Sequence, residues 1–219
     1  FPTVAPCKTA PRDHGALWGR PARVTVDDDA VTAEWTAPDA GWTFTRILHR
    51  RDTDVIPTLY RLTNHGPEPL VWMWSQHCLI APQPGDRIML SGVSNLTSGE
   101  RSFDWPVLDG QDLSCLSNDI DWMAKVYGTA GPQVRAEIQN AQGGLEFIWS
   151  GDEIPAFGLW ISQGGWHGTQ QIAIEPTTCP ADDLDSARQR GQEMRLAPGE
   201  TRHWTVTLRP TGPHVSHRR

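Results

Sequence analysis

The run Thr58-Leu59-Tyr60-Arg61-Leu62-Thr63, followed at once by Asn64-His65-Gly66-Pro67, shows the pattern that decides the fold of this chain. Strand-forming residues come first, and a turn signal containing glycine and proline ends them, which is typical of a β-strand that leads into a reversal. Similar runs recur with turn signals between them, at residues 22–26, 31–35, 42–48, 70–74, 87–90, 134–138, 145–149, 158–161, 171–174 and 201–208. So many short strands predict an all-β chain built as a large antiparallel β-sandwich with few short helices.

One stretch favours a helix instead. Residues 182–190 (DDLDSARQR) combine an acidic start with helix-forming residues. The length of 219 residues suits one β-rich domain, and no internal linker or repeat is visible. We therefore expect a single domain over residues 1–210 and a polar tail over residues 211–219.

The charge of the chain bears on its partners. The formal net charge is −7, and the acidic residues are scattered apart from Asp27-Asp28-Asp29. This balance argues against nucleic acid and against an anionic membrane as partners. Eleven tryptophans stand against two tyrosines; we expect most of them in the core and one or two as a flat platform for a ligand ring.

The four cysteines, at positions 7, 78, 115 and 179, lie far apart and lack CxxC spacing. They match neither a disulfide framework nor a zinc site. Reduced and mostly buried thiols are the expectation, which favours a cytoplasmic location.

Two residues are candidates for proton transfer, His77 and Glu175. On a strand over residues 70–79, His77 shares a face with Ser75, and on the strand that ends at Pro176, Glu175 shares a face with Ala173. These small neighbours leave room for a ligand above each side chain. Each residue also has a structural interpretation: a half-buried histidine, and a carboxylate satisfied by backbone amides or by an arginine.

His14 and Arg20 are further candidates. His14 lies in the predicted turn Asp13-His14-Gly15, where Asp13 can orient it, and the alternative is an ordinary loop histidine. His14, His77 and Glu175 could in principle form a two-histidine, one-carboxylate metal site, but no pair has close spacing, so we expect no metal. The sequence contains no G-x-S-x-G segment, so it lacks the motif that would indicate a serine hydrolase.

Taken in order, several segments resemble the aldose 1-epimerase (galactose mutarotase-like) superfamily through most of the chain. They are Asp13-His14-Gly15, Tyr60-Arg61-Leu62-Thr63-Asn64-His65-Gly66, Trp74-Ser75-Gln76-His77, Pro84-Gly85-Asp86, Ile174-Glu175-Pro176-Thr177-Thr178 and Leu196-Ala197-Pro198-Gly199-Glu200. The chain differs from that family in Cys78-Leu79-Ile80 after the histidine, and the usual N-terminal strands are missing before Phe1.

The resemblance implies a β-supersandwich that binds a carbohydrate and interconverts the α and β anomers of a free sugar. By position, Glu175 would be the base that takes the proton of the C1 hydroxyl, and His77 the acid that protonates the ring oxygen. His14 would bind and polarise the sugar, with Arg20 as a further contact. The reaction needs no cofactor, since a carboxylate and an imidazole can carry both protons.

Two other functions stay open at this stage. A non-catalytic carbohydrate-binding β-sandwich would keep the sugar contacts without the reaction. A lyase would need a tyrosine or lysine base, and Tyr60 lies inside a predicted strand. Without an evident basic cluster for a phosphate group, a neutral hexose or pentose is the expected substrate.

Overall fold

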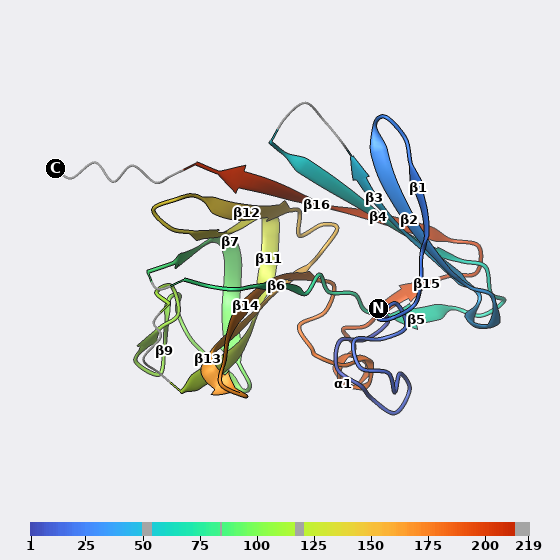
Figure 1. Ribbon diagram of the computed structural model, residues 1–219. Helices are drawn as coiled ribbons and strands as arrows, with labels where there is room; N and C mark the ends of the chain where they lie inside the picture. The colour runs from blue at the N-terminus through green and yellow to red at the C-terminus, as the bar shows by residue number, and fades with distance from the viewer. Residues whose placement is uncertain (50–53, 84, 117–120, 213–219) are drawn as a thin grey trace. The chain divides into compact units, whose positions relative to one another are not determined.

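The computed structural model of the chain describes residues 1–49, 54–83, 85–116 and 121–212 (Figure 1). These residues form two compact units, and antiparallel strands make up most of each. The first unit comprises Phe1–Ser75 and Thr177–Thr207, and the second comprises Gln76–Pro176 and the chain from Leu208 onward. The prediction of one domain over residues 1–210 is not tested by this division and stays a prediction.

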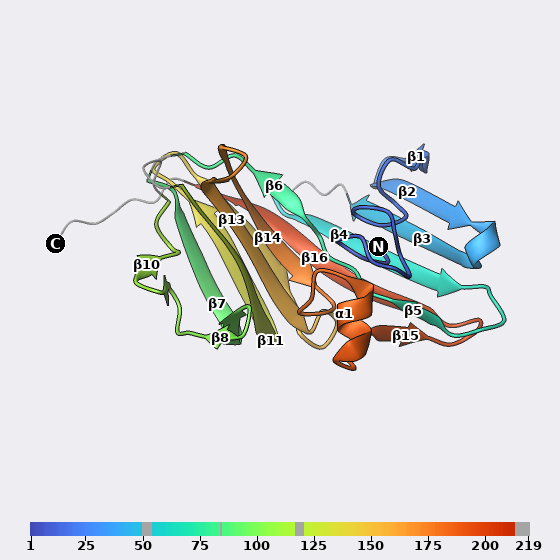
Figure 2. The same cartoon turned by 90° about the horizontal axis from the view of Figure 1, so that it is seen from below.

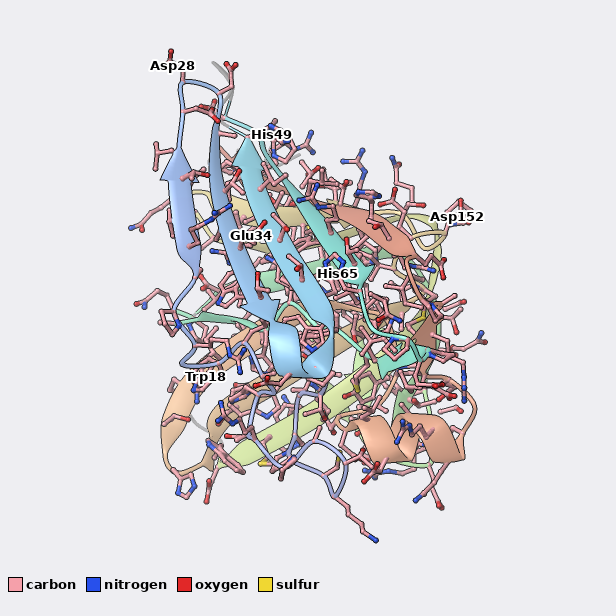
Figure 3. All side chains as sticks on the ribbon, turned by 90° about the vertical axis from the view of Figure 1, so that its right-hand side faces the viewer. Trp18, Asp28, Glu34, His49, His65 and Asp152 are labelled. Atoms are coloured by element: carbon pink, nitrogen blue, oxygen red, sulfur yellow. The ribbon has the colours of Figure 1, made fainter. Side chains whose placement is uncertain are left out.

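The first unit contains a sheet in the order β1-β2-β3-β4-β16, a small two-stranded sheet of β5 and β15, a 3-10 turn η1 and the helix α1. The bounds are β1 Arg23–Val26, β2 Ala30–Ala37, η1 Pro38–Ala40, β3 Trp42–His49, β4 Ile56–Asn64, β5 Leu70–Trp72, α1 Leu184–Gln189, β15 Met194–Leu196 and β16 Thr201–Thr211, which ends in the second unit. The acidic run of the sequence forms the β1–β2 turn, with Asp28 at its tip (Figure 3). The carboxylate of Asp27 accepts hydrogen bonds there from the backbone amides of Asp29 and Ala30.

Aromatic side chains fill the core of the first unit. The fully buried Trp204 on β16 stacks on Tyr60 of β4, with ring centroids 5.8 Å apart, and on Trp72 of β5 at 5.2 Å. Phe44 contacts Trp204 edge-on at 6.0 Å. Large flat rings bury much apolar surface per residue, so a few of them suffice to hold these strands together.

The helix lies where the sequence predicts it. Asp183 caps its N-terminus by accepting a hydrogen bond from the backbone amide of Ser186. Leu184 and Ala187 are buried on its inner face, in a cluster with Met73 and Cys179. The predicted range 182–190 thus includes both caps of the helix.

The second unit is arranged around the long strand β11. Its strands are β6 Cys78–Ile80, β7 Arg87–Ser98, β8 Arg101–Ser102, β9 Val107–Leu108, β10 Gln111–Asp112, β11 Trp122–Gln139, β12 Gly144–Trp149, β13 Ala156–Trp166 and β14 Thr169–Thr177. Along one edge β11 pairs first with β13 and then with β12, and β7 pairs with it as well. The order continues from β13 through β14 to β6 (Figure 2).

A glycine allows β7 to follow β11 through an irregularity in their register. The register shifts between Ala130 and Arg135, and Gly92 of β7 lies there with a φ of 75°. A Cβ atom at Gly92 would lie 1.9 Å from the carbonyl oxygen of Gln133. Only glycine fits this position, because the left-handed backbone and the close approach both exclude a side chain.

The predicted runs overlap observed strands, the first of them beginning one residue before β1, and one run needs correction. The predicted strand over residues 70–79 is interrupted, because β5 ends at Trp72 and β6 begins only at Cys78. Trp72, Met73 and Trp74 are all buried, so the alternation that a strand requires is lost there. The expectation that Ser75 and His77 share a strand face is therefore wrong. The short strands β6, β8, β9, β10 and β15 and the first half of β11 were not predicted.

The remaining predictions have mixed outcomes. Only Cys179 is buried, while the other three thiols are half-buried, so the expectation of mostly buried cysteines is wrong; all four are free thiols. Of the eleven tryptophans the core encloses five, namely Trp42, Trp72, Trp74, Trp149 and Trp204. The predicted tail lies outside the described residues from 213 onward, and Thr211 belongs to β16. No helix in the described part of the chain has the length and apolar character needed to cross a membrane.

Burial gives Cys179 a distinctive reactivity. Removal from water raises the pKa of its thiol from 9.0 to about 11. Because the thiolate is the reactive form, we expect iodoacetamide at pH 8 to alkylate Cys179 at least ~10-fold more slowly than Cys7, Cys78 and Cys115 in the folded protein. Peptide mass spectrometry at successive times measures the four rates, and unfolding in denaturant should equalise them. Equal rates in the folded protein would contradict the assignment of Cys179 to the core.

Candidate active site

The pairing of β6 with β14 brings His77 to Glu175. In this antiparallel pair Ile172 lies opposite Ile80, and Ile174 lies opposite Cys78. One step further, the same register sets Glu175 opposite His77, and the backbone amide of Gln76 donates to the carbonyl of Pro176. The result is a distance of 3.5 Å between His77 Nε2 and Glu175 Oε1.

The carboxylate of Glu175 is buried, with 1% of its side chain exposed, and Lys125 compensates its charge. The ammonium of Lys125 on β11 donates to both carboxylate oxygens, at 2.6 Å to Oε1 and 2.8 Å to Oε2. A buried charge is tolerated only when it is paired and hydrogen-bonded, and this two-point contact supplies both. Lys125 and His77 keep 20% and 23% of their side chains exposed, so both groups beside the buried carboxylate are partly accessible to solvent.

A glycine on the intervening strand β13 makes room for the carboxylate. Gly158 lies opposite Tyr127 of β11 in the sheet register. A Cβ atom at Gly158 would lie 3.1 Å from Glu175 Cβ, 3.4 Å from Glu175 Oε2 and 3.4 Å from Tyr127 Cε1. A side chain here would press on Glu175 at its Cβ atom, so Gly158 leaves the space that the Glu175 side chain occupies. Lys125 Nζ also lies over the Tyr127 ring, 5.1 Å from its centroid.

Aromatic rings continue from His77 along β13. The centroid of the Trp160 ring lies 6.1 Å from that of His77, and Trp160 lies opposite Lys125 in the register. Trp166, at the end of β13, is 6.4 Å from Trp160 and 48% exposed. The expectation that one or two tryptophans form a flat platform for a ligand ring stays a prediction, for which Trp160 and Trp166 are the candidates.

The other two predicted site residues, His14 and Arg20, belong to the first unit. His14 has a φ of 54°, lies 3.7 Å from the Asp13 carboxylate and contacts the ring of Trp18 at 4.7 Å. Trp18 is 68% exposed (Figure 3). The guanidinium of Arg20 donates to the carbonyl oxygen of Thr36 at 3.3 Å. Their roles in binding substrate stay predictions.

Sequence reasoning missed Lys125. The structural interpretation of Glu175 expected a partner for its carboxylate, but an arginine at the strand end rather than a lysine two strands away in the sheet order. One signal could have found it: the chain has 17 arginines and only two lysines, Lys8 and Lys125. A lysine within an apolar strand of a chain that otherwise uses arginine indicates a position where a compact ammonium is needed.

The assembled groups are suited to moving protons. An imidazole at 3.5 Å and an ammonium at 2.6 Å lie beside the same carboxylate, which is shielded from water. Such a set can accept a proton at one ligand atom and donate one at a neighbouring atom. Among residues 1–49, 54–83, 85–116 and 121–212, no cluster of three His, Cys, Asp or Glu side chains is arranged to hold a metal ion.

Comparison of the sequence with known families gives no match to any family model, and no curated protein sequence matches it. Comparison of the structure does give matches. A galactose mutarotase related enzyme from Lactobacillus acidophilus superimposes with a TM-score of 0.73 at 13% identity, covering 97% of this chain and 82% of its own. A protein provisionally assigned as an aldose 1-epimerase from Escherichia coli K12 gives 0.69 at 19% identity, with coverages of 94% and 74%.

A third structure, provisionally assigned as an aldose 1-epimerase from Klebsiella pneumoniae, gives a TM-score of 0.64 at 15% identity. The match covers 87% of this chain, which spans about half, 53%, of the Klebsiella protein. Identities this low are informative about the fold alone. The chain has the antiparallel β-sandwich fold of the galactose mutarotase-like, or aldose 1-epimerase, superfamily.

Proposed function

We propose that this protein is an aldose 1-epimerase-like isomerase, which interconverts the α and β anomers of a free sugar. The observation that carries the proposal is the 3.5 Å distance between the imidazole of His77 and the buried carboxylate of Glu175. The names of the structurally similar proteins from Lactobacillus acidophilus and Escherichia coli support the same activity.

The geometry suits the chemistry of ring opening. The two oxygens that exchange protons, the C1 hydroxyl and the ring oxygen, are bonded to the same carbon atom, so their catalytic partners must also be neighbours. Glu175 takes the proton of the C1 hydroxyl while protonated His77 gives a proton to the ring oxygen, and the bond between C1 and the ring oxygen breaks. The product is the open-chain aldehyde and a hydroxyl at the former ring oxygen.

Ring closure reverses these roles. After rotation about the C1–C2 bond, His77 removes the proton from the hydroxyl that attacks C1, and Glu175 returns its proton to the aldehyde oxygen. Both residues finish in their starting state, so the cycle needs no cofactor. In this proposal Trp160 packs against a C–H face of the ring.

The proposed substrate is a neutral hexose or pentose. The ammonium of Lys125 is already engaged with Glu175, so this pair offers no spare positive charge to a phosphate group. Four free thiols support a reducing, cytoplasmic location.

Substitution of the proposed acid and base tests the assignment. Polarimetry on a panel of neutral aldoses should show accelerated mutarotation by the wild-type protein. Glu175→Gln and His77→Asn should each lower kcat by ~10²- to 10⁴-fold, the usual contribution of general acid–base catalysis. Glu100→Gln and His203→Asn make the same chemical changes at exposed positions and should leave the rate unchanged.

Two outcomes would contradict the proposal. Sugar binding measured by calorimetry without any acceleration would favour a non-catalytic carbohydrate-binding sandwich. Acceleration that survives Glu175→Gln and His77→Asn would place the reaction elsewhere in the molecule.

Gly158 provides a second test, through the position of the carboxylate. We expect Gly158→Ala to lower kcat by about 10-fold while the protein stays folded, because the new methyl group displaces Glu175 by a few tenths of an ångström. Gly212→Ala is the matched control, since a Cβ atom there meets nothing within 4 Å. Circular dichroism monitors folding, and a Gly158→Ala protein with full activity would show that the position of Glu175 is not critical.

A further inference from the structure

We infer that Lys125 is a positioning residue for the proposed reaction: it holds both oxygens of Glu175, directs Oε1 at His77 and neutralises the carboxylate between turnovers. The catalytic consequence rests on the proposed function, whereas the counter-ion role does not. Nothing in the sequence pattern of the superfamily resemblance points to this lysine, and the inference comes from the contacts of the second unit.

The contact fixes the orientation of the carboxylate. An ammonium that reaches only one oxygen would leave the carboxylate able to rotate about its last bond. Lys125 Nζ instead lies 2.6 Å from Oε1 and 2.8 Å from Oε2, so rotation would break one of two short hydrogen bonds. Oε1, the oxygen with the shorter contact, is also the one that lies 3.5 Å from His77 Nε2. Lys125 therefore sets which oxygen faces the imidazole.

The lysine is itself held in place. Its strand position opposite Trp160 is set by the β11–β13 register, and its ammonium lies 5.1 Å from the centroid of the Tyr127 ring. Attraction to the face of that ring adds to the restraint from the carboxylate. A flexible lysine side chain is thus confined at its base by the sheet and at its tip by two partners.

The charge of Lys125 suits a base that must return its proton. An ammonium beside Glu175 supplies the counter-charge that a buried carboxylate needs before it takes a proton and after it returns one. Glu175 performs both tasks in one cycle, since it takes the C1 proton on opening and gives it back on closure.

Loss of the ammonium should also change the pH at which His77 loses its proton. The titratable groups that these contacts place around Glu175 are Lys125 and Tyr127 from β11 and His77 from the segment before β6. Without the ammonium of Lys125, the carboxylate that faces the imidazole would have less compensating positive charge beside it, and its attraction would hold the imidazolium proton to higher pH. The alkaline limb of the rate profile should then move upward.

The experiment compares Lys125→Met with Lys125→Arg. The control is Lys8→Met, which removes the other lysine of the chain, an exposed residue. For the aldose with the highest wild-type rate, we expect Lys125→Met to lower kcat by ~10- to 100-fold with less than ~3-fold change in KM, and to move the alkaline limb upward by about one pH unit. Lys125→Arg should recover part of kcat and return the alkaline limb of the pH–rate profile to its wild-type position. Lys8→Met should behave as wild type.

A second readout separates this inference from the proposed function. Proton NMR follows the His77 ring signals with pH, and His77→Asn identifies them. Even in a protein that accelerates no sugar, Lys125→Met should move this titration upward, and the double variant Lys125→Met/Glu175→Gln should bring it back. If Lys125→Met does not fold, Lys125→Gln and Lys125→Arg make the same comparison, with a shift expected only for glutamine. A folded Lys125→Met or Lys125→Gln protein with unchanged His77 titration would overturn the inference.

Discussion

A carboxylate that is almost completely buried needs a compensating charge, and this constraint organises the second unit around Glu175. Lys125 supplies the charge and contacts both carboxylate oxygens, Gly158 leaves the space, and His77 faces the oxygen that makes the shorter contact. Each of these residues comes from a different segment, namely β11, β13 and the chain before β6. Removing the cation from a buried ion pair costs about 3–5 kcal/mol in typical proteins.

Sheet register, rather than local sequence, brings the groups together. Lys125 and Glu175 are 50 residues apart, and they meet because β13 lies between β11 and β14 in the sheet. His77 meets Glu175 because three residue pairs between β6 and β14 fix the alignment just beyond it. A slip of one residue in β14 would turn Glu175 to the opposite face and remove both contacts at once. The relative positions of the site residues are therefore set by the pairing of four strands, β6, β14, β13 and β11.

The sequence predicted the fold class and most strands because alternation and turn residues are local signals. It failed at residues 73–77, where three consecutive buried side chains break alternation before the short strand β6. The nearness of His77 to Glu175 was expected only through resemblance to a family, since no spacing rule joins them. The pairing of Lys125 with Glu175 could not be predicted from local sequence, because an ion pair between β11 and β14 depends on the register of the strands. The exposure of Cys78 had no local signal either.

The central claim is that Glu175 and His77 act together on the C1 hydroxyl and the ring oxygen of one sugar. The most direct measurement is a crystal structure of Glu175→Gln soaked with the best neutral aldose, since this variant can bind but cannot accept the proton. The account predicts the C1 hydroxyl within hydrogen-bonding distance of residue 175 and the ring oxygen facing His77. A sugar bound with C1 turned away from both residues, or bound at another place, would contradict it.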